Sequence, residues 1–165
     1  MEKIWIQELI KAEEQAEQTG IIDNSFHLDQ DHILATESLQ FLLRLKAEFT
    51  EALSAFNELK PGPLGRIKIY GIAKTHADFM LFRNGFKMIF SMKQAGQIII
   101  RFNFIGAGFI PGTEAAQGTS LMDDTIIESQ FAPFGEVKWT YQGKEFSETK
   151  MVQYYLSHFI RVSTR

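Results

Sequence analysis

The chain has 165 residues, of which 45% are hydrophobic and 22% are charged, and this is the composition of one globular domain rather than of a disordered chain. It contains no cysteine, which excludes disulfides, thiolate catalysis and zinc–thiolate sites. The net charge is −3, so the chain as a whole lacks the positive footprint that is typical of nucleic-acid-binding domains.

The charge is distributed unevenly along the chain. Residues 1–59 include four basic and twelve acidic residues, a net charge of −8. Residues 60–101 include eight basic residues and one acid, a net charge of +7. The remaining residues include five basic and seven acidic ones, a net charge of −2. An acidic half followed by a basic block indicates that charge contributes to the choice of partners.

The sequence shows no targeting or membrane signal. Its first residues lack the basic start and the unbroken apolar run of a signal peptide. The most apolar stretch, residues 97–111, is interrupted by Arg101 and Asn103 and is shorter than the roughly 20 residues of a membrane helix. We therefore expect no membrane association and, by default, a cytoplasmic location.

Hydrophobic periodicity predicts two helices before residue 60. Residues 2–18 place Ile6, Leu9 and Ile10 among acidic and amide residues, and this helix is expected to end near Gly20. A longer helix from about residue 31 to residue 59 carries apolar residues three and four apart on one face: Leu42, Leu45, Phe49, Ala52, Phe56 and Leu59. Two prolines and two glycines between residues 61 and 65 end it.

The dipeptide Asn84–Gly85 lies between two apolar runs and predicts a β-hairpin, because both central positions of a type I′ turn need positive φ. This turn places Phe79 opposite Phe90, and a second turn at residues 94–96 places Phe90 opposite Ile100. The two registers agree, so one face of three strands is expected to be core and to pack on the long helix. That face collects Phe79, Leu81, Phe86, Met88, Phe90, Ile98, Ile100, Phe102 and Phe104.

Further strands are predicted at residues 66–74, 125–131, 136–141 and 144–146, followed by a final helix at residues 148–160 that Ser147 can cap. No repeat or linker divides the chain. We therefore predict a single α+β domain over residues 1–165. Its N-terminal helix and long second helix pack on a mostly antiparallel meander sheet of five to seven strands, and a C-terminal helix closes it.

The opposite face of the central strands is the predicted binding surface, because it is too apolar for open water and too charged for a core. Its candidate residues are Phe82, Lys87, Ile89, Lys93 and Arg101. We expect these residues to contact a protein partner or a second copy of the chain. Alternatively, the acidic first helix covers this face, within the chain or across a dimer.

The same surface also suits an anionic ligand or single-stranded nucleic acid, with cations on the phosphates and aromatic rings stacked on bases. Nucleic acid is not favoured, because only one aromatic residue, Phe82, lies on this face and the chain is acidic overall.

Residues 106–122 are rich in glycine, alanine and threonine and include Gly106, Gly108 and Gly112. A phosphate-binding loop would be followed by a Lys–Ser/Thr pair or by the start of a helix, and this segment is followed by neither. The segment is a flap candidate or a plain loop, since long loops are often functional. The third hypothesis is therefore a small-molecule binder or an enzyme whose cavity, between sheet and helices, this loop gates.

The remaining chemistry is less specific. His27, Asp29 and Asp31 form the densest group of potential metal ligands, but Asp29 or Asp31 is better explained as an acid at the start of the long helix. Tyr141, Tyr154, Tyr155 and Trp139 could line a pocket, although aromatic residues at such spacing are more often core. No Gly-x-Ser-x-Gly elbow or other catalytic constellation is present. We predict no catalytic residue, no metal and no cofactor, and favour a non-enzymatic binding or assembly module.

Overall fold

A computed structural model describes residues 3–21, 30–60, 62, 64–72, 77–105, 119–120 and 122–164. The chain divides into two compact units, Met1–Gln30 and Asp31–Arg165. None of the helices in the described ranges is both long and apolar enough to cross a membrane.

The described part of the first unit is the helix α1 (Ile4–Thr19). It ends at Gly20, which adopts the left-handed conformation at φ 65° and donates its N–H to the carbonyl oxygen of Ala16; glycine does this at little cost. No residue of α1 is buried, and Trp5, Leu9 and Ile10 are exposed. A single helix cannot bury its own apolar stripe, so the apolar side chains of α1 are not buried within this unit.

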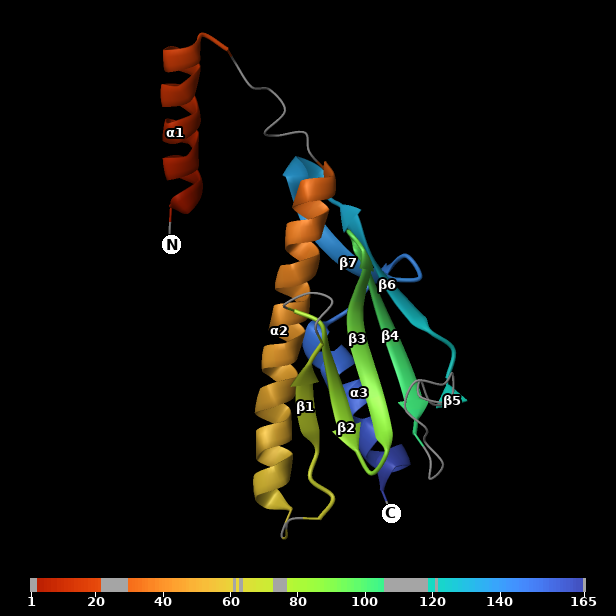
Figure 1. Cartoon of the computed structure of the whole chain (residues 1–165). Helices are drawn as coiled ribbons and strands as arrows, with labels where there is room; N and C mark the ends of the chain where they lie inside the picture. The colour runs from red at the N-terminus through yellow and green to blue at the C-terminus, as the bar shows by residue number, and fades with distance from the viewer. Residues whose placement is uncertain are drawn as a thin grey trace. The chain divides into compact units, whose positions relative to one another are not determined.

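The second unit is built on an antiparallel sheet (Figure 1). Seven strands follow one another across it: β1 (Lys68–Gly71), β2 (Phe79–Arg83), β3 (Phe86–Gln94), β4 (Gln97–Phe104), β6 (Thr125–Phe131), β7 (Val137–Tyr141) and β8 (Lys144–Glu145). A two-residue strand, β5 (Thr119–Ser120), pairs with the end of β4 outside this order. The predicted α+β fold with an antiparallel meander sheet is therefore confirmed.

The first turn forms as expected, and the register of the three central strands is the predicted one, whereas the second turn is shorter than predicted. Asn84 and Gly85 have φ values of 52° and 83°, so both central positions are left-handed. Phe79 pairs with Phe90, and Phe90 pairs with Ile100, as the sequence predicts. A bulge between Met92 and Gln94 adds one residue to β3 before the second turn, so the pairing next to the turn is Gln94 with Gln97.

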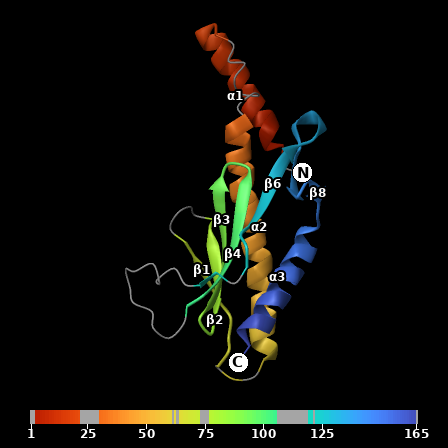
Figure 2. The same ribbon diagram turned by 90° about the vertical axis from the view of Figure 1, so that its right-hand side faces the viewer.

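Two helices, α2 (Gln30–Leu59) and α3 (Glu148–Ser163), cover the same face of the sheet (Figure 2). From α2, Phe49 packs on Phe90 with ring centroids 4.9 Å apart, and Phe41 stacks on Trp139 of β7 at 4.4 Å. From α3, Tyr155 packs on Phe90 in an edge-to-face arrangement with ring centroids 6.0 Å apart. The core therefore lies between these helices and the strand face that the sequence predicts to be buried.

Several boundaries differ from the prediction for local reasons. The first strand begins at Lys68 rather than residue 66, because the side-chain amide of Asn57 binds both backbone groups of Ile67, each at 3.0 Å. The last helix continues to Ser163, because Asn84 donates from its side chain to the carbonyl oxygen of Ser163 at 2.8 Å. Leu59, predicted on the apolar stripe, is exposed at the end of α2.

Candidate functional site

The face of the sheet that points away from α2 and α3 holds the predicted binding surface, and we call it the outer face. Four of the five predicted residues lie together on it. Phe82 pairs with Lys87, and Ile89 pairs with Arg101, so these residues are cross-strand neighbours. Phe82, Lys87 and Ile89 are half-buried and Arg101 is exposed.

Lys93 does not join this group. It is exposed at the bulge near the opposite end of β3, six residues beyond Lys87, which corresponds to about 20 Å along a strand. The sequence prediction grouped it with the others because alternation gives the face of a residue but not its distance along the strand, and it ignores the bulge.

The strand β1 adds two residues that the sequence prediction left out of this surface. Lys68 pairs with Phe82, and Tyr70 pairs with Met80. The ring of Tyr70 meets that of Phe82 edge to face, with centroids 6.4 Å apart. Phe82 therefore lies between two lysines, Lys68 and Lys87, one on each neighbouring strand. The outer face of β1 to β4 also carries the buried pair Ser91 and Ile99. Its half-buried and exposed residues are Lys68, Tyr70, Met80, Phe82, Lys87, Ile89, Arg101 and Asn103.

The cations of the outer face are not equivalent. The guanidinium Nε of Arg101 lies 3.2 Å from Oδ2 of Asp124, and both side chains are largely exposed. Such a pair contributes little to stability but offsets the charge of Arg101 locally. Farther along the same face, Lys138 lies 3.2 Å from Glu145, whose hydrogen bond raises the pKa of the lysine. The net positive charge is thus concentrated at Lys68 and Lys87.

Five other predicted candidates lie outside the described residues. These are Gly106, Gly108 and Gly112 of the flap candidate, together with His27 and Asp29. Asp31 is in the first turn of α2, where a negative charge interacts favourably with the helix dipole. In the described ranges, no three His, Asp or Glu side chains come close enough together to hold a metal ion.

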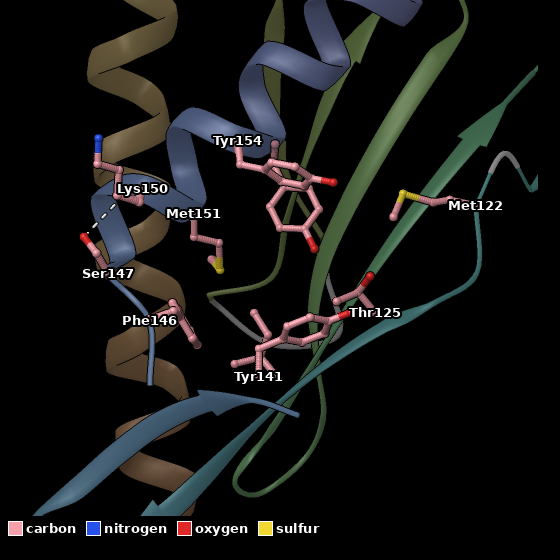
Figure 3. Close-up of a pocket in the computed structure, with 10 residues that line it drawn as sticks. Met122, Thr125, Tyr141, Phe146, Ser147, Lys150, Met151 and Tyr154 are labelled. Atoms are coloured by element: carbon pink, nitrogen blue, oxygen red, sulfur yellow. Dashed lines mark hydrogen bonds between the residues drawn. The ribbon is translucent and has the colours of Figure 1, made fainter. Parts of the chain in front are cut away.

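A pocket of about 350 Å³ opens on the helix side of the sheet, between β6, β7 and the first turns of α3 (Figure 3). Its apolar wall includes Ile127 and Met151, and its rim includes Tyr141 and Tyr154. Tyr155 also lines it, whereas Trp139 belongs to the core against Phe41. Of the four aromatic residues weighed as pocket or core, the three tyrosines line this pocket.

Burial raises the pKa of the Tyr155 phenol, and a hydrogen bond with Thr125 partly opposes this shift. Because the folded-state pKa lies above the unfolded value of about 10, this group contributes full stability below pH 10. We expect its contribution to be lost as the pH rises through the folded-state pKa. Chemical denaturation at a series of alkaline pH values should show a steeper loss in the wild type than in Tyr155→Phe. The exposed Tyr154→Phe variant serves as control, and a slope equal in all three proteins would contradict this expectation.

Comparisons with protein-family models, with curated proteins and with solved structures found no match to this chain.

Proposed function

We propose that this protein is a non-enzymatic assembly module in which the outer face of one copy binds the acidic helix α1 of a second copy. The observation that carries this proposal is that Lys68 and Lys87 flank Phe82 on an amphipathic sheet face. The same chain supplies an amphipathic helix of opposite charge, so every copy offers both halves of a complementary interface.

The helix α1 has the chemistry that this surface requires. Its apolar residues Ile6, Leu9 and Ile10 are spaced three and four apart and so lie on one stripe. Glu13 and Glu17 continue the same stripe, because they follow Leu9 and Glu13 by four residues each. One face of α1 is therefore apolar in its first half and acidic in its second half.

The outer face also combines apolar and charged residues, but its charges are positive. Met80 and Ile89 are paired across β2 and β3 and offer apolar contacts. Lys68 and Lys87 both pair with Phe82, one from each side. Each is two residues along its strand from the residue that pairs with Met80. An acidic helix laid across these strands buries apolar side chains next to pairs of opposite charges.

A second groove is apolar but has the wrong charge for α1. It runs between α2 and α3 and includes Val152, Leu156 and Ala52. Glu48 and Glu51 line the same groove and repel an acidic helix. Charge therefore favours the outer face. Exchange of α1 between two copies gives a closed two-fold dimer, because each copy donates one helix and receives one.

Charge reversal tests this proposal in the full chain. We expect Lys68→Glu/Lys87→Glu to raise the dimer dissociation constant about tenfold or more, because it places like charges opposite each other. Glu13→Lys/Glu17→Lys should have the same effect, and the combination of all four substitutions should restore dimerisation. Sedimentation equilibrium over a range of protein concentrations measures each constant.

The control variant is Lys144→Glu/Lys150→Glu, which makes the same change of charge away from the outer face and should leave the constant unchanged. A wild-type monomer at every concentration, or failure of the four-fold variant to recover, contradicts the proposal. If the chain instead binds a single-stranded oligonucleotide with an affinity that falls steeply with salt, the nucleic-acid alternative is favoured. The cytoplasmic location stays a prediction.

A further inference from the structure

The pocket beside α3 has the size and the wall of a small-molecule site. Its volume of about 350 Å³ falls at the lower end of the range for ligand pockets, which favours a compact molecule. Ile127 and Met151 are almost completely buried at its wall, and Phe146 adds an aromatic ring. The wall therefore favours an apolar body.

Aromatic rings surround the opening. Figure 3 shows Tyr141 and Thr125, from the sheet, across the pocket from Tyr154 and Met151, from α3. The rings of Tyr154 and Tyr155 stand nearly perpendicular, at 85°, with centroids 5.2 Å apart. A flat aromatic ligand can stack on these rings and contact the methionine sulfur, both of which are favourable contacts.

The polar groups favour a negative charge on the ligand. Lys150 is the one charged residue among the described residues that line the pocket, and Ser147 caps α3 at the same end. Glu148, in the same turn, is paired with Arg44 at 2.9 Å. The hydroxyl groups of the tyrosines both donate and accept hydrogen bonds and select no charge by themselves. In Figure 3 the Lys150 side chain extends away from the rings of Tyr141 and Tyr154, so its ammonium group reaches an anion at the edge of the mouth only after the side chain rotates.

We propose that this pocket binds a compact aromatic molecule that carries a single anionic group, such as an aromatic sulfonate or carboxylate. The ring system lies against Ile127 and Met151 between Tyr141 and Tyr154, and the anion lies at the mouth beside Lys150. This site is on the opposite side of the sheet from the outer face and does not depend on assembly.

Two dyes with the same ring system test the site in the full-length protein. The first is 1-anilinonaphthalene-8-sulfonate, and the second is N-phenyl-1-naphthylamine, which lacks the sulfonate. We expect both to bind saturably in a fluorescence titration. The sulfonate should bind more tightly by about two- to fivefold, the range for one solvent-exposed charge pair.

Variants locate the bound dye. Tyr141→Ala/Tyr154→Ala should weaken both dyes about tenfold, because it removes the two rim rings. These rings are largely exposed, so we expect the variant to keep its core. Lys150→Gln should leave the neutral dye unchanged and remove the preference for the sulfonate. The control Phe82→Ser/Lys87→Gln alters the outer face and should bind both dyes as the wild type does.

Three results would overturn the proposal. If the outer-face control loses the dyes while the rim variant keeps them, the dye site is elsewhere. If no dye binds saturably, the pocket is not a ligand site. If the two dyes bind the wild type equally, or Lys150→Gln keeps the sulfonate preference, the anionic part of the proposal is wrong.

Discussion

Replacement of Phe90 by alanine is expected to lower the free energy of unfolding by about 3–5 kcal/mol, the range for a fully buried phenylalanine. The Phe90 side chain is completely buried and stacks on Phe79 with centroids 4.9 Å apart and planes 9° apart. It also meets Phe49 of α2 and Tyr155 of α3. One ring therefore joins two strands and both covering helices, and its loss leaves a cavity where these elements meet.

Guanidinium denaturation followed by circular dichroism measures this loss, and Phe82→Ala is the matched control. Phe82 lies on the neighbouring strand β2, but its side chain is half-buried on the outer face. We expect this variant to lose only about 1 kcal/mol, as is usual away from a core. Equal losses in the two variants would contradict the assignment of the two faces. A loss of 3–5 kcal/mol is a large share of the about 5–15 kcal/mol of a typical domain.

The register of the central strands was predictable because two independent signals agree on it. Asn84–Gly85 is a turn that few other residue pairs can make, and the alternation on either side allows one pairing to bury its apolar set. A shift by one residue would move Phe90 to solvent and Lys87 to the core. Four of the five outer-face candidates followed from that register.

Neighbours that depend on longer connections were not predictable. No two-residue turn joins β1 to β2, so the sequence did not show that Lys68 and Tyr70 flank Phe82. The sequence also did not predict whether the three tyrosines line a pocket or belong to the core. Their spacing suits a core and a cavity wall alike, and the choice depends on the gap between α3 and β6–β7.

Arg83 is an exception to the rule that the core positions of a strand are apolar, because backbone carbonyl groups accept hydrogen bonds from its buried side chain. It occupies a core position of β2 and is only 3% exposed, and burial lowers its pKa. Its Nε donates to the carbonyl oxygen of Gly65 at 2.8 Å, and its Nη1 donates to that of Ile160 at 3.3 Å. The guanidinium also lies over the ring of Phe56. These partners are far from Arg83 in the sequence. The alternation of apolar and polar residues therefore does not reveal that the hydrogen-bond donors of a buried arginine find acceptors at this position.

Gly96→Ala should lower the free energy of unfolding by about 2–4 kcal/mol, because a left-handed backbone and a close approach act together at this residue. Its φ is +81°, and a Cβ placed there would lie 2.6 Å from Oγ of Ser129 and 3.3 Å from Cδ1 of Leu34. The backbone N–H of Gly96 donates to Oγ of Ser38 at 2.8 Å, and its carbonyl oxygen accepts from the N–H of Ser129 at 2.8 Å. The turn thereby ties α2 to β6.

The variant Gly143→Ala separates the cost of a left-handed backbone from the cost of crowding by neighbouring atoms. Gly143 has nearly the same φ, +78°, but a Cβ there would meet nothing within 4 Å. Its substitution should cost only the backbone term, about 1 kcal/mol. Chemical denaturation of both variants then yields the cost of crowding at Ser129 and Leu34 as the difference between them. If the two variants lose equal stability, Ser129 and Leu34 accommodate the added Cβ without cost, which contradicts the expected crowding at Gly96.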